Sequence, residues 1–116
     1  MLDAKTYVYC TTRFVGFHRW PDAPSEVKYL RDNHRHEFHV KVTVQVGHND
    51  RDVEFITLRE RVDELFSGGS SIHQFGAKSC EMIAEDIISF VEADGTYKIH
   101  SVEVSEDGEN GAIVVC

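Results

Sequence analysis

The stretch His-Arg-His-Glu-Phe-His-Val-Lys-Val-Thr-Val-Gln-Val at residues 34–46 decides the fold of this chain. After the first two histidines its even positions are all apolar, while its odd positions are polar or charged. Side chains alternate between the two faces of a β-strand with a period of two, whereas a helix would scatter this pattern around its circumference. Valines at four successive even positions favour a strand further, because they are β-branched. Residues 34–46 therefore predict a long strand with one apolar and one polar face.

Two histidines, His34 and His36, begin the apolar face of this strand. They point the same way, roughly 7 Å apart along the strand. Such a pair suits two of the four ligand positions around Zn²⁺. The alternative is that both side chains are half-buried at a strand end and only form hydrogen bonds, so the pair alone leaves the metal question open.

The composition is that of one globular domain spanning residues 1–116, with 41% hydrophobic and 28% charged residues. The net charge is −8 and no cluster of Lys or Arg occurs. This predicts that neither nucleic acid nor an anionic membrane surface is a partner. No apolar run has the length of a transmembrane helix.

The first residues, Met-Leu-Asp-Ala-Lys-Thr, lack the charged and then apolar build of a signal peptide. The three cysteines are an odd number and lie far apart in the sequence. This pattern is more typical of a reduced protein than of a disulfide scaffold. We therefore expect a cytoplasmic location.

The rest of the chain contains further alternating and helical patterns. Thr57, followed by Glu60, has the form of a capping box, and Ser79 is expected to cap a second helix with an inner face that includes Met82. We expect the order β-β-α-α-β-β, an α+β fold, from strands at 5–18, 34–46, 98–106 and 112–116, helices at 57–66 and 79–94, and loops at 20–33, 67–71 and 107–110.

A third histidine, His18, ends the first predicted strand on the same face as Phe14. In an antiparallel hairpin the end of one strand faces the start of the next. The sequence therefore predicts that three histidines converge at one end of the sheet. Three ligands leave a fourth position open for water or substrate, which is the arrangement of a catalytic zinc.

These histidines lie in a pattern that resembles the 6-pyruvoyltetrahydropterin synthase and 6-carboxytetrahydropterin synthase family. Phe14-x-Gly16-x-His18 followed by His34-x-His36 is similar to that family's F-x-A-x-H and H-G-H motifs. Further similar segments follow in the family's order. They are Val-Glu-Phe-Ile-Thr-Leu-Arg at 53–59 (family I-D-F-x-x-L-K), Ser-Cys-Glu-Met-Ile-Ala at 79–84 (T-x-E-x-L-A) and Val-Glu-Val-Ser-Glu at 102–106 (V-x-V-x-E-T).

The resemblance implies a T-fold, which is a four-stranded antiparallel sheet with two helices on one face. Such subunits associate into barrels, typically trimers that stack into hexamers, and the active sites lie between subunits. A homo-oligomer would explain why both faces of the predicted strand at 5–18 carry apolar side chains.

The resemblance also implies a ligand set and a pocket. Glu106 would bind the amino and ring N–H groups of a pterin or purine-like ligand through charge-assisted hydrogen bonds. Ser79 and Glu81 would line the same pocket, at the start of the second helix. The Zn²⁺ ligands would be His18, His34 and His36.

The chain departs from the family pattern in its proton-transfer residues. Leu30 stands where the family has its general-base cysteine, and residues 65–69 lack the family's Asp-His pair. Arg35 replaces the glycine of H-G-H, with its side chain pointing away from the metal face. The substitutes that the sequence offers for the missing base are His73, Asp32 and Glu26.

Three hypotheses follow from these residues. The first and favoured one is a zinc-dependent lyase of biopterin or deazaguanine (queuosine) biosynthesis, acting on 7,8-dihydroneopterin triphosphate or a related pterin with a non-standard general base. The second is a module that binds a pterin, purine or nucleotide without performing the family reaction. The third is a T-fold used only for assembly.

Overall fold

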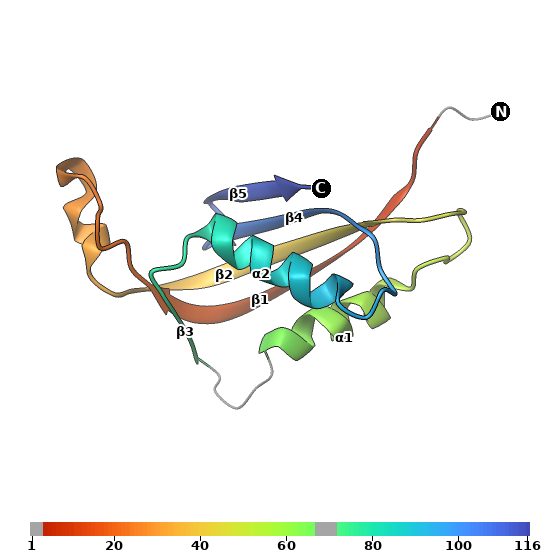
Figure 1. Ribbon diagram of the computed structural model, residues 1–116, viewed down its shortest axis with the longest axis horizontal. Helices are drawn as coiled ribbons and strands as arrows, with labels where there is room; N and C mark the ends of the chain where they lie inside the picture. The colour runs from red at the N-terminus through yellow and green to blue at the C-terminus, as the bar shows by residue number, and fades with distance from the viewer. Residues whose placement is uncertain (1–3, 67–71) are drawn as a thin grey trace.

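The computed structural model describes residues 4–66 and 72–116, so the loop predicted at 67–71 lies outside the described residues. The described residues form five strands, two α-helices and one 3-10 helix (Figure 1). In chain order the elements are β1 (Tyr7–His18), η1 (Ser25–Arg31), β2 (His34–Gln45), α1 (Phe55–Phe66), β3 (Ile72–Gly76), α2 (Cys80–Glu92), β4 (Ile99–Glu106) and β5 (Asn110–Val115).

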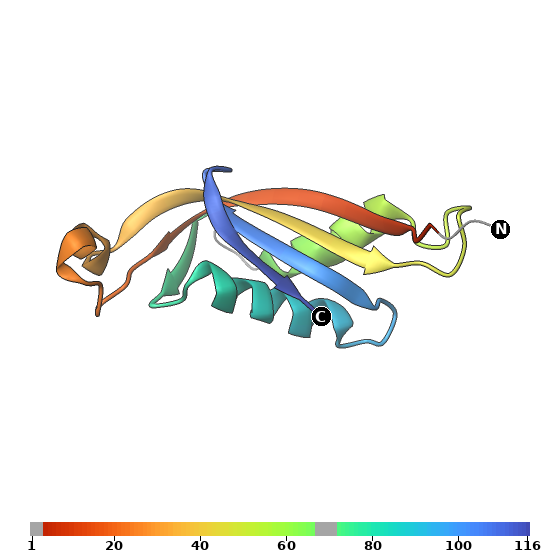
Figure 2. The same ribbon diagram turned by 90° about the horizontal axis from the view of Figure 1, so that it is seen from above.

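The strands form a single sheet in the order β3-β1-β2-β4-β5. Strands β1, β2, β4 and β5 pair antiparallel, as the sequence predicts. Strand β3 pairs parallel to β1, so the described sheet has five strands and is mixed, not the four-stranded antiparallel sheet that we expected. Both α-helices lie on one side of the sheet (Figure 2). The α+β class is confirmed.

The core lies between this sheet and the two α-helices. The even positions of β2 from Phe38 to Val44 are buried, which confirms the alternation read from the sequence. On the opposite face of the sheet Tyr9, Ile113 and Val115 are exposed. The buried side chains that pack against β2 are Val102 and Val104 of β4, Leu58 and Val62 of α1, and Ile83, Ile87 and Val91 of α2.

Strand β3 is the element that the sequence analysis missed. It lies beside the end of β1, with His73 opposite Gly16. A Cβ atom on residue 16 would lie 2.6 Å from the Phe75 ring, so glycine at this position makes room for β3. The rings of Phe14, Phe38 and Phe75 then pack together, with centroids 5.4–5.6 Å apart. The five residues Ile-His-Gln-Phe-Gly show no apolar alternation and are too few to predict a strand that pairs with a distant segment.

The helix boundaries differ slightly from the prediction. Helix α1 begins at Phe55, and its cap is Glu54, which accepts hydrogen bonds from the backbone N–H of Thr57 at 2.8 Å and from its hydroxyl at 3.1 Å. The expectation that Thr57 is the cap is therefore wrong. Ser79 does cap α2, accepting a hydrogen bond from the Met82 N–H at 3.2 Å. Met82 itself is 51% exposed, not on the inner face.

We expected a loop at 20–33 between β1 and β2, but this segment contains the 3-10 helix η1. This 3-10 helix has no buried residues and projects beyond the end of the sheet (Figure 1). The Arg31 side chain holds the segment together by donating to the backbone oxygen of Ala23 at 2.8 Å. Within residues 4–66 and 72–116, no helix is long and apolar enough to span a membrane.

Candidate metal centre and adjoining pocket

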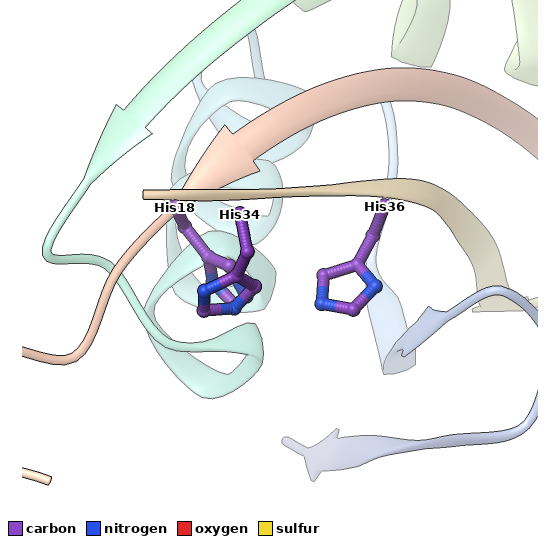
Figure 3. Close-up of side chains that lie close together, drawn as sticks. All are labelled: His18, His34 and His36. Carbon is purple, nitrogen blue, oxygen red and sulfur yellow. The ribbon is translucent and has the colours of Figure 1, made fainter. Parts of the chain in front are cut away.

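The three histidines of the sequence motif lie together at the end of the sheet where β1 ends and β2 begins. The antiparallel register pairs His18 with His34, and Gly16 with His36. One ring nitrogen from each histidine lies within 4.8 Å of those of the other two. The rings project from the two strands to the same side of the sheet (Figure 3). The structure therefore brings these three side chains into one cluster.

His18 is the most enclosed member of the cluster, with 7% of its surface exposed, and the other two histidines are partly buried. Burial lowers the pKa of His18, although a hydrogen bond with a backbone carbonyl and the nearby Glu106 act in the opposite direction. The imidazole of His18 is therefore neutral at physiological pH. A neutral imidazole is the form that binds a metal ion.

The Nδ1 atom of each histidine faces an oxygen that can only accept a hydrogen bond. Because a carbonyl or carboxylate oxygen offers no proton, each Nδ1 must carry the hydrogen and donate it. In a neutral ring this leaves the Nε2 atom with a free lone pair. The three contacts are His18 Nδ1 to the Lys78 carbonyl at 2.9 Å, His34 Nδ1 to the Asp32 carbonyl at 2.9 Å, and His36 Nδ1 to Asp107 Oδ2 at 2.8 Å.

The Nε2 atoms of His18 and His36 are buried, and neither has a hydrogen-bond partner among the residues that the structure describes. Leaving a buried polar atom unsatisfied costs roughly 1–3 kcal/mol. A metal ion accepting both lone pairs would remove this cost. Three imidazoles, each with Nδ1 held by an oxygen acceptor, are also the donor set of a zinc site with its supporting hydrogen bonds. The residues therefore fit a Zn²⁺ ion.

Asp107 is a site residue that the sequence analysis missed, because we had assigned it only to a turn. One carboxylate oxygen accepts from His36 Nδ1, and the other accepts from the Glu37 backbone N–H at 2.9 Å. The hydrogen bond from the Glu37 N–H lowers the pKa of this carboxyl most, and the one from His36 lowers it further. The carboxyl is therefore ionised. Its φ of 58° lies in the left-handed region, which Asp tolerates better than most residues. The sequence offered one signal for this role, an acidic residue directly after Glu106.

We predict that Asp107→Ala weakens zinc binding by about 10- to 100-fold, the usual cost of removing the hydrogen-bond partner of a metal-binding histidine. Competition with a chromophoric chelator measures the change. Asp107→Asn should retain part of the affinity, since its amide oxygen can still accept from His36 Nδ1. Glu109→Ala, in the same turn and exposed, is the matched control. Equal affinities for the Asp107→Ala and Glu109→Ala variants would show that Asp107 does not support the ligand.

A cavity of about 460 Å³ opens beside the histidines. His18 and His34 form part of its wall. The three residues predicted to bind the substrate, Ser79, Glu81 and Glu106, line the same cavity. Leu30, Trp20, Met82 and Cys80 also line it.

The three candidate proton-transfer residues lie outside this cavity. His73, Asp32 and Glu26 are all absent from the residues that line it, and Glu26 lies in η1. The His73 ring packs against Phe14 and Phe66, with centroids 5.3 and 5.6 Å apart. Asp32 contacts the histidine cluster through its backbone carbonyl, which accepts a hydrogen bond from His34.

Cys80 lies beside Glu106 and donates its S–H to Oε1 of that carboxylate, with sulfur and oxygen 3.9 Å apart. Burial is the main cause that raises the pKa of the Cys80 thiol to about 12, and the negative charges of Glu106 and Glu81 add to it. The thiol is therefore protonated at neutral pH. It orients the carboxylate, and it is a poor nucleophile.

The same pKa shifts predict which cysteine reacts with iodoacetamide in the folded protein at pH 8. Cys10 is also buried, and burial raises the pKa of its thiol to about 11. Cys116 is exposed, so it should be alkylated first. Peptide mass spectrometry should find label at Cys116 alone in native protein and at all three cysteines in urea. Rapid native labelling of Cys80 would contradict this placement.

The fold is that of the 6-pyruvoyltetrahydropterin synthases, a T-fold. Comparison with protein-family models and with curated proteins finds no match. The similar solved structures include Caenorhabditis elegans 6-pyruvoyl tetrahydropterin synthase (TM-score 0.71, 12% identity, 97% of this chain and 96% of that one). They also include an uncharacterized protein from Wolinella succinogenes (0.66, 15%, 97% and 99%) and Plasmodium vivax 6-pyruvoyltetrahydropterin synthase (0.65, 15%, 97% and 98%).

Proposed function

We propose that this protein is a zinc-dependent lyase of the 6-pyruvoyl/6-carboxytetrahydropterin synthase type, acting on 7,8-dihydroneopterin triphosphate or a related pterin. The observation that carries the proposal is the position of the three histidines in relation to Glu106. Two buried, unpartnered Nε2 atoms lie beside this carboxylate, and His18, His34 and Glu106 all line one cavity. A metal-binding group and a group that recognises N–H donors therefore share one pocket.

In this proposal His18, His34 and His36 would hold the zinc, which would supply a Lewis acid that polarises a substrate oxygen and so acidifies the carbon that bears it. Glu106 accepts hydrogen bonds from the amino and ring N–H groups of the pterin. Ser79 and Glu81 lie at the start of α2, where the Ser79 hydroxyl is already engaged with the helix N-terminus. These two residues line the cavity beside Glu106.

The proton-transfer group is proposed to be Asp32 or His73. We favour Asp32, because it is exposed and its backbone carbonyl accepts a hydrogen bond from His34. His73 is packed among phenylalanine rings and would need to turn toward the substrate. We therefore expect Asp32→Asn to lower kcat by about 10²- to 10⁴-fold, the usual contribution of a general acid or base.

A second candidate function is a pterin- or purine-binding module that keeps the pocket without performing the reaction. The observation that favours it is Leu30, which stands where the family has its general base and lines the cavity itself. A leucine at this position cannot accept a proton, but it can pack against the apolar edge of a bound ring. The two candidates share the pocket and differ only in turnover.

Turnover separates the two candidates. Zinc-loaded protein incubated with 7,8-dihydroneopterin triphosphate should release inorganic triphosphate, and Glu106→Gln should raise KM. Retention of a pterin by equilibrium dialysis, with no triphosphate released, would decide for the binding module. A protein that neither releases triphosphate nor retains a pterin would contradict both candidates.

We also propose that the protein forms a homo-oligomer, a trimer or a hexamer, with its sites between subunits. Supporting this, Tyr9 is 56% exposed on the outer face of the sheet, and Ile113 and Val115 are more than 60% exposed on the edge strand β5. Exposed apolar groups on a sheet edge favour association with another chain. Light scattering coupled to gel filtration measures the mass, and a monomer would contradict the proposal.

A further inference from the structure

The carboxylate of Glu106 lies closer to the histidine cluster than binding a substrate alone requires. Its Oε1 is 3.2 Å from His18 Nε2, and its Oε2 is 3.1 Å from His36 Nε2. The pairing of Phe38 with Glu106 in neighbouring strands places this side chain on the histidine face of the sheet. Cys80 donates to Oε1 from the other side and orients the group.

These two contacts are not ordinary ion pairs. A protonated Nε2 would donate its hydrogen in the plane of the ring, pointing away from the ring centre. Neither Nε2 has a hydrogen-bond partner among the described residues. Both Nδ1 hydrogens are already used, by the Lys78 carbonyl and by Asp107. When both rings are neutral, two atoms that carry lone pairs and no hydrogen therefore lie about 3 Å apart in each contact. Such an arrangement is electrostatically unfavourable unless a cation lies between these atoms.

The two distances are slightly shorter than those between neighbouring atoms of a tetrahedral ligand shell. Metal–ligand bonds of about 2.0–2.2 Å place neighbouring ligand atoms ~3.3–3.6 Å apart. The separations between the Glu106 oxygens and the two nitrogens lie just below this range. Ligand atoms in such a shell point at the shared ion and not at one another, which agrees with the missing hydrogen-bond geometry.

We propose that Glu106 is the fourth metal ligand in the substrate-free protein, so that the resting site is closed. This inference rests on the zinc site of the proposed function and adds a regulatory step to it. A pterin whose N–H groups bind the carboxylate would compete with the metal for Glu106. His18, His34 and His36 would then hold the ion and leave one position for water or substrate.

Cobalt(II) substitution tests the inference, because its visible absorption reports the number and type of ligands. We expect Glu106→Gln to change the Co²⁺ spectrum and to weaken binding by roughly 10²-fold, the loss of one ligand. Glu103→Gln, on the same strand but facing Lys41 on the outer side of the sheet, is the matched control and should match the wild type. If Glu106→Gln does not fold, Glu106→Asp, whose shorter side chain reaches less far, serves the same comparison.

Neopterin, which carries no triphosphate to release, then probes the exchange. Adding it to the Co²⁺ wild-type protein should shift the spectrum toward that of Glu106→Gln. A Glu106→Gln protein with the spectrum and affinity of wild type would overturn the inference, as would an unchanged wild-type spectrum once neopterin is bound. Absence of triphosphate release by the zinc protein would contradict the lyase proposal alone, since these spectra do not depend on turnover.

Discussion

Replacing His34 and His36 together by alanine is expected to abolish zinc binding. Structural zinc sites with four ligands bind with roughly 10–16 kcal/mol in total, or about 3 kcal/mol for each ligand. Losing two ligands should therefore weaken binding by ~10⁴-fold, from stoichiometric retention to none after dialysis. Elemental analysis of the purified protein measures the zinc content, and chelator competition measures the affinity.

The control for this variant is His39→Ala with His48→Ala. His39 lies on β2 as well, but it faces the opposite side of the sheet and contacts Glu37, and His48 lies in the exposed turn after β2. This variant removes the same number of imidazoles without touching the cluster. Zinc retained equally by both double variants would mean that the three histidines are not the metal site.

The histidine cluster could be predicted from the sequence because two local patterns carry it. The alternation in residues 34–46 places His34 and His36 on one face, and the antiparallel pairing of β1 with β2 brings His18 opposite His34. Both inferences depend only on the period of a strand and the geometry of a hairpin.

The supporting residues could not be predicted in the same way, because they depend on pairing between distant segments. Asp107 reaches His36 only because Glu106 pairs with Phe38, nearly seventy positions away in the sequence. Lys78 and Cys80 reach the cluster because α2 packs across the sheet. A turn residue, a lysine carbonyl and a lone cysteine carry no local pattern that would reveal these roles.

The missed strand has a similar explanation. Strand β3 depends on a parallel pairing with β1 and on the absence of a side chain at Gly16, and neither is visible in the short segment Ile72–Gly76 itself. The four antiparallel strands were predictable because their alternation is longer and their partners, within each hairpin, are close in sequence. Long-range pairing thus separates the elements that could be predicted from those that could not.

The second prediction with a large expected effect concerns Phe38, whose side chain is fully buried. Phe38→Ala should lower the free energy of unfolding by about 3–5 kcal/mol, because it removes a buried ring and leaves a cavity. Urea denaturation of the metal-free protein in excess chelator measures this loss without a contribution from zinc. Phe55→Ala is the matched control, since Phe55 is 56% exposed. A surface substitution of this kind usually changes stability by less than about 0.5 kcal/mol.

The same ring also connects the core to the histidine cluster. Its centroid lies 5.2 Å from that of His18 and 5.8 Å from that of His36, with both histidine rings nearly perpendicular to it. Removing it leaves both imidazoles without packing on one side, so we expect Phe38→Ala to weaken zinc binding even under conditions where the variant is folded. Phe38→Leu should restore most of the stability but less of the affinity, because a leucine fills volume without offering a flat surface. Equal unfolding midpoints for Phe38→Ala and Phe55→Ala would show that this ring does not hold the sheet and the site together.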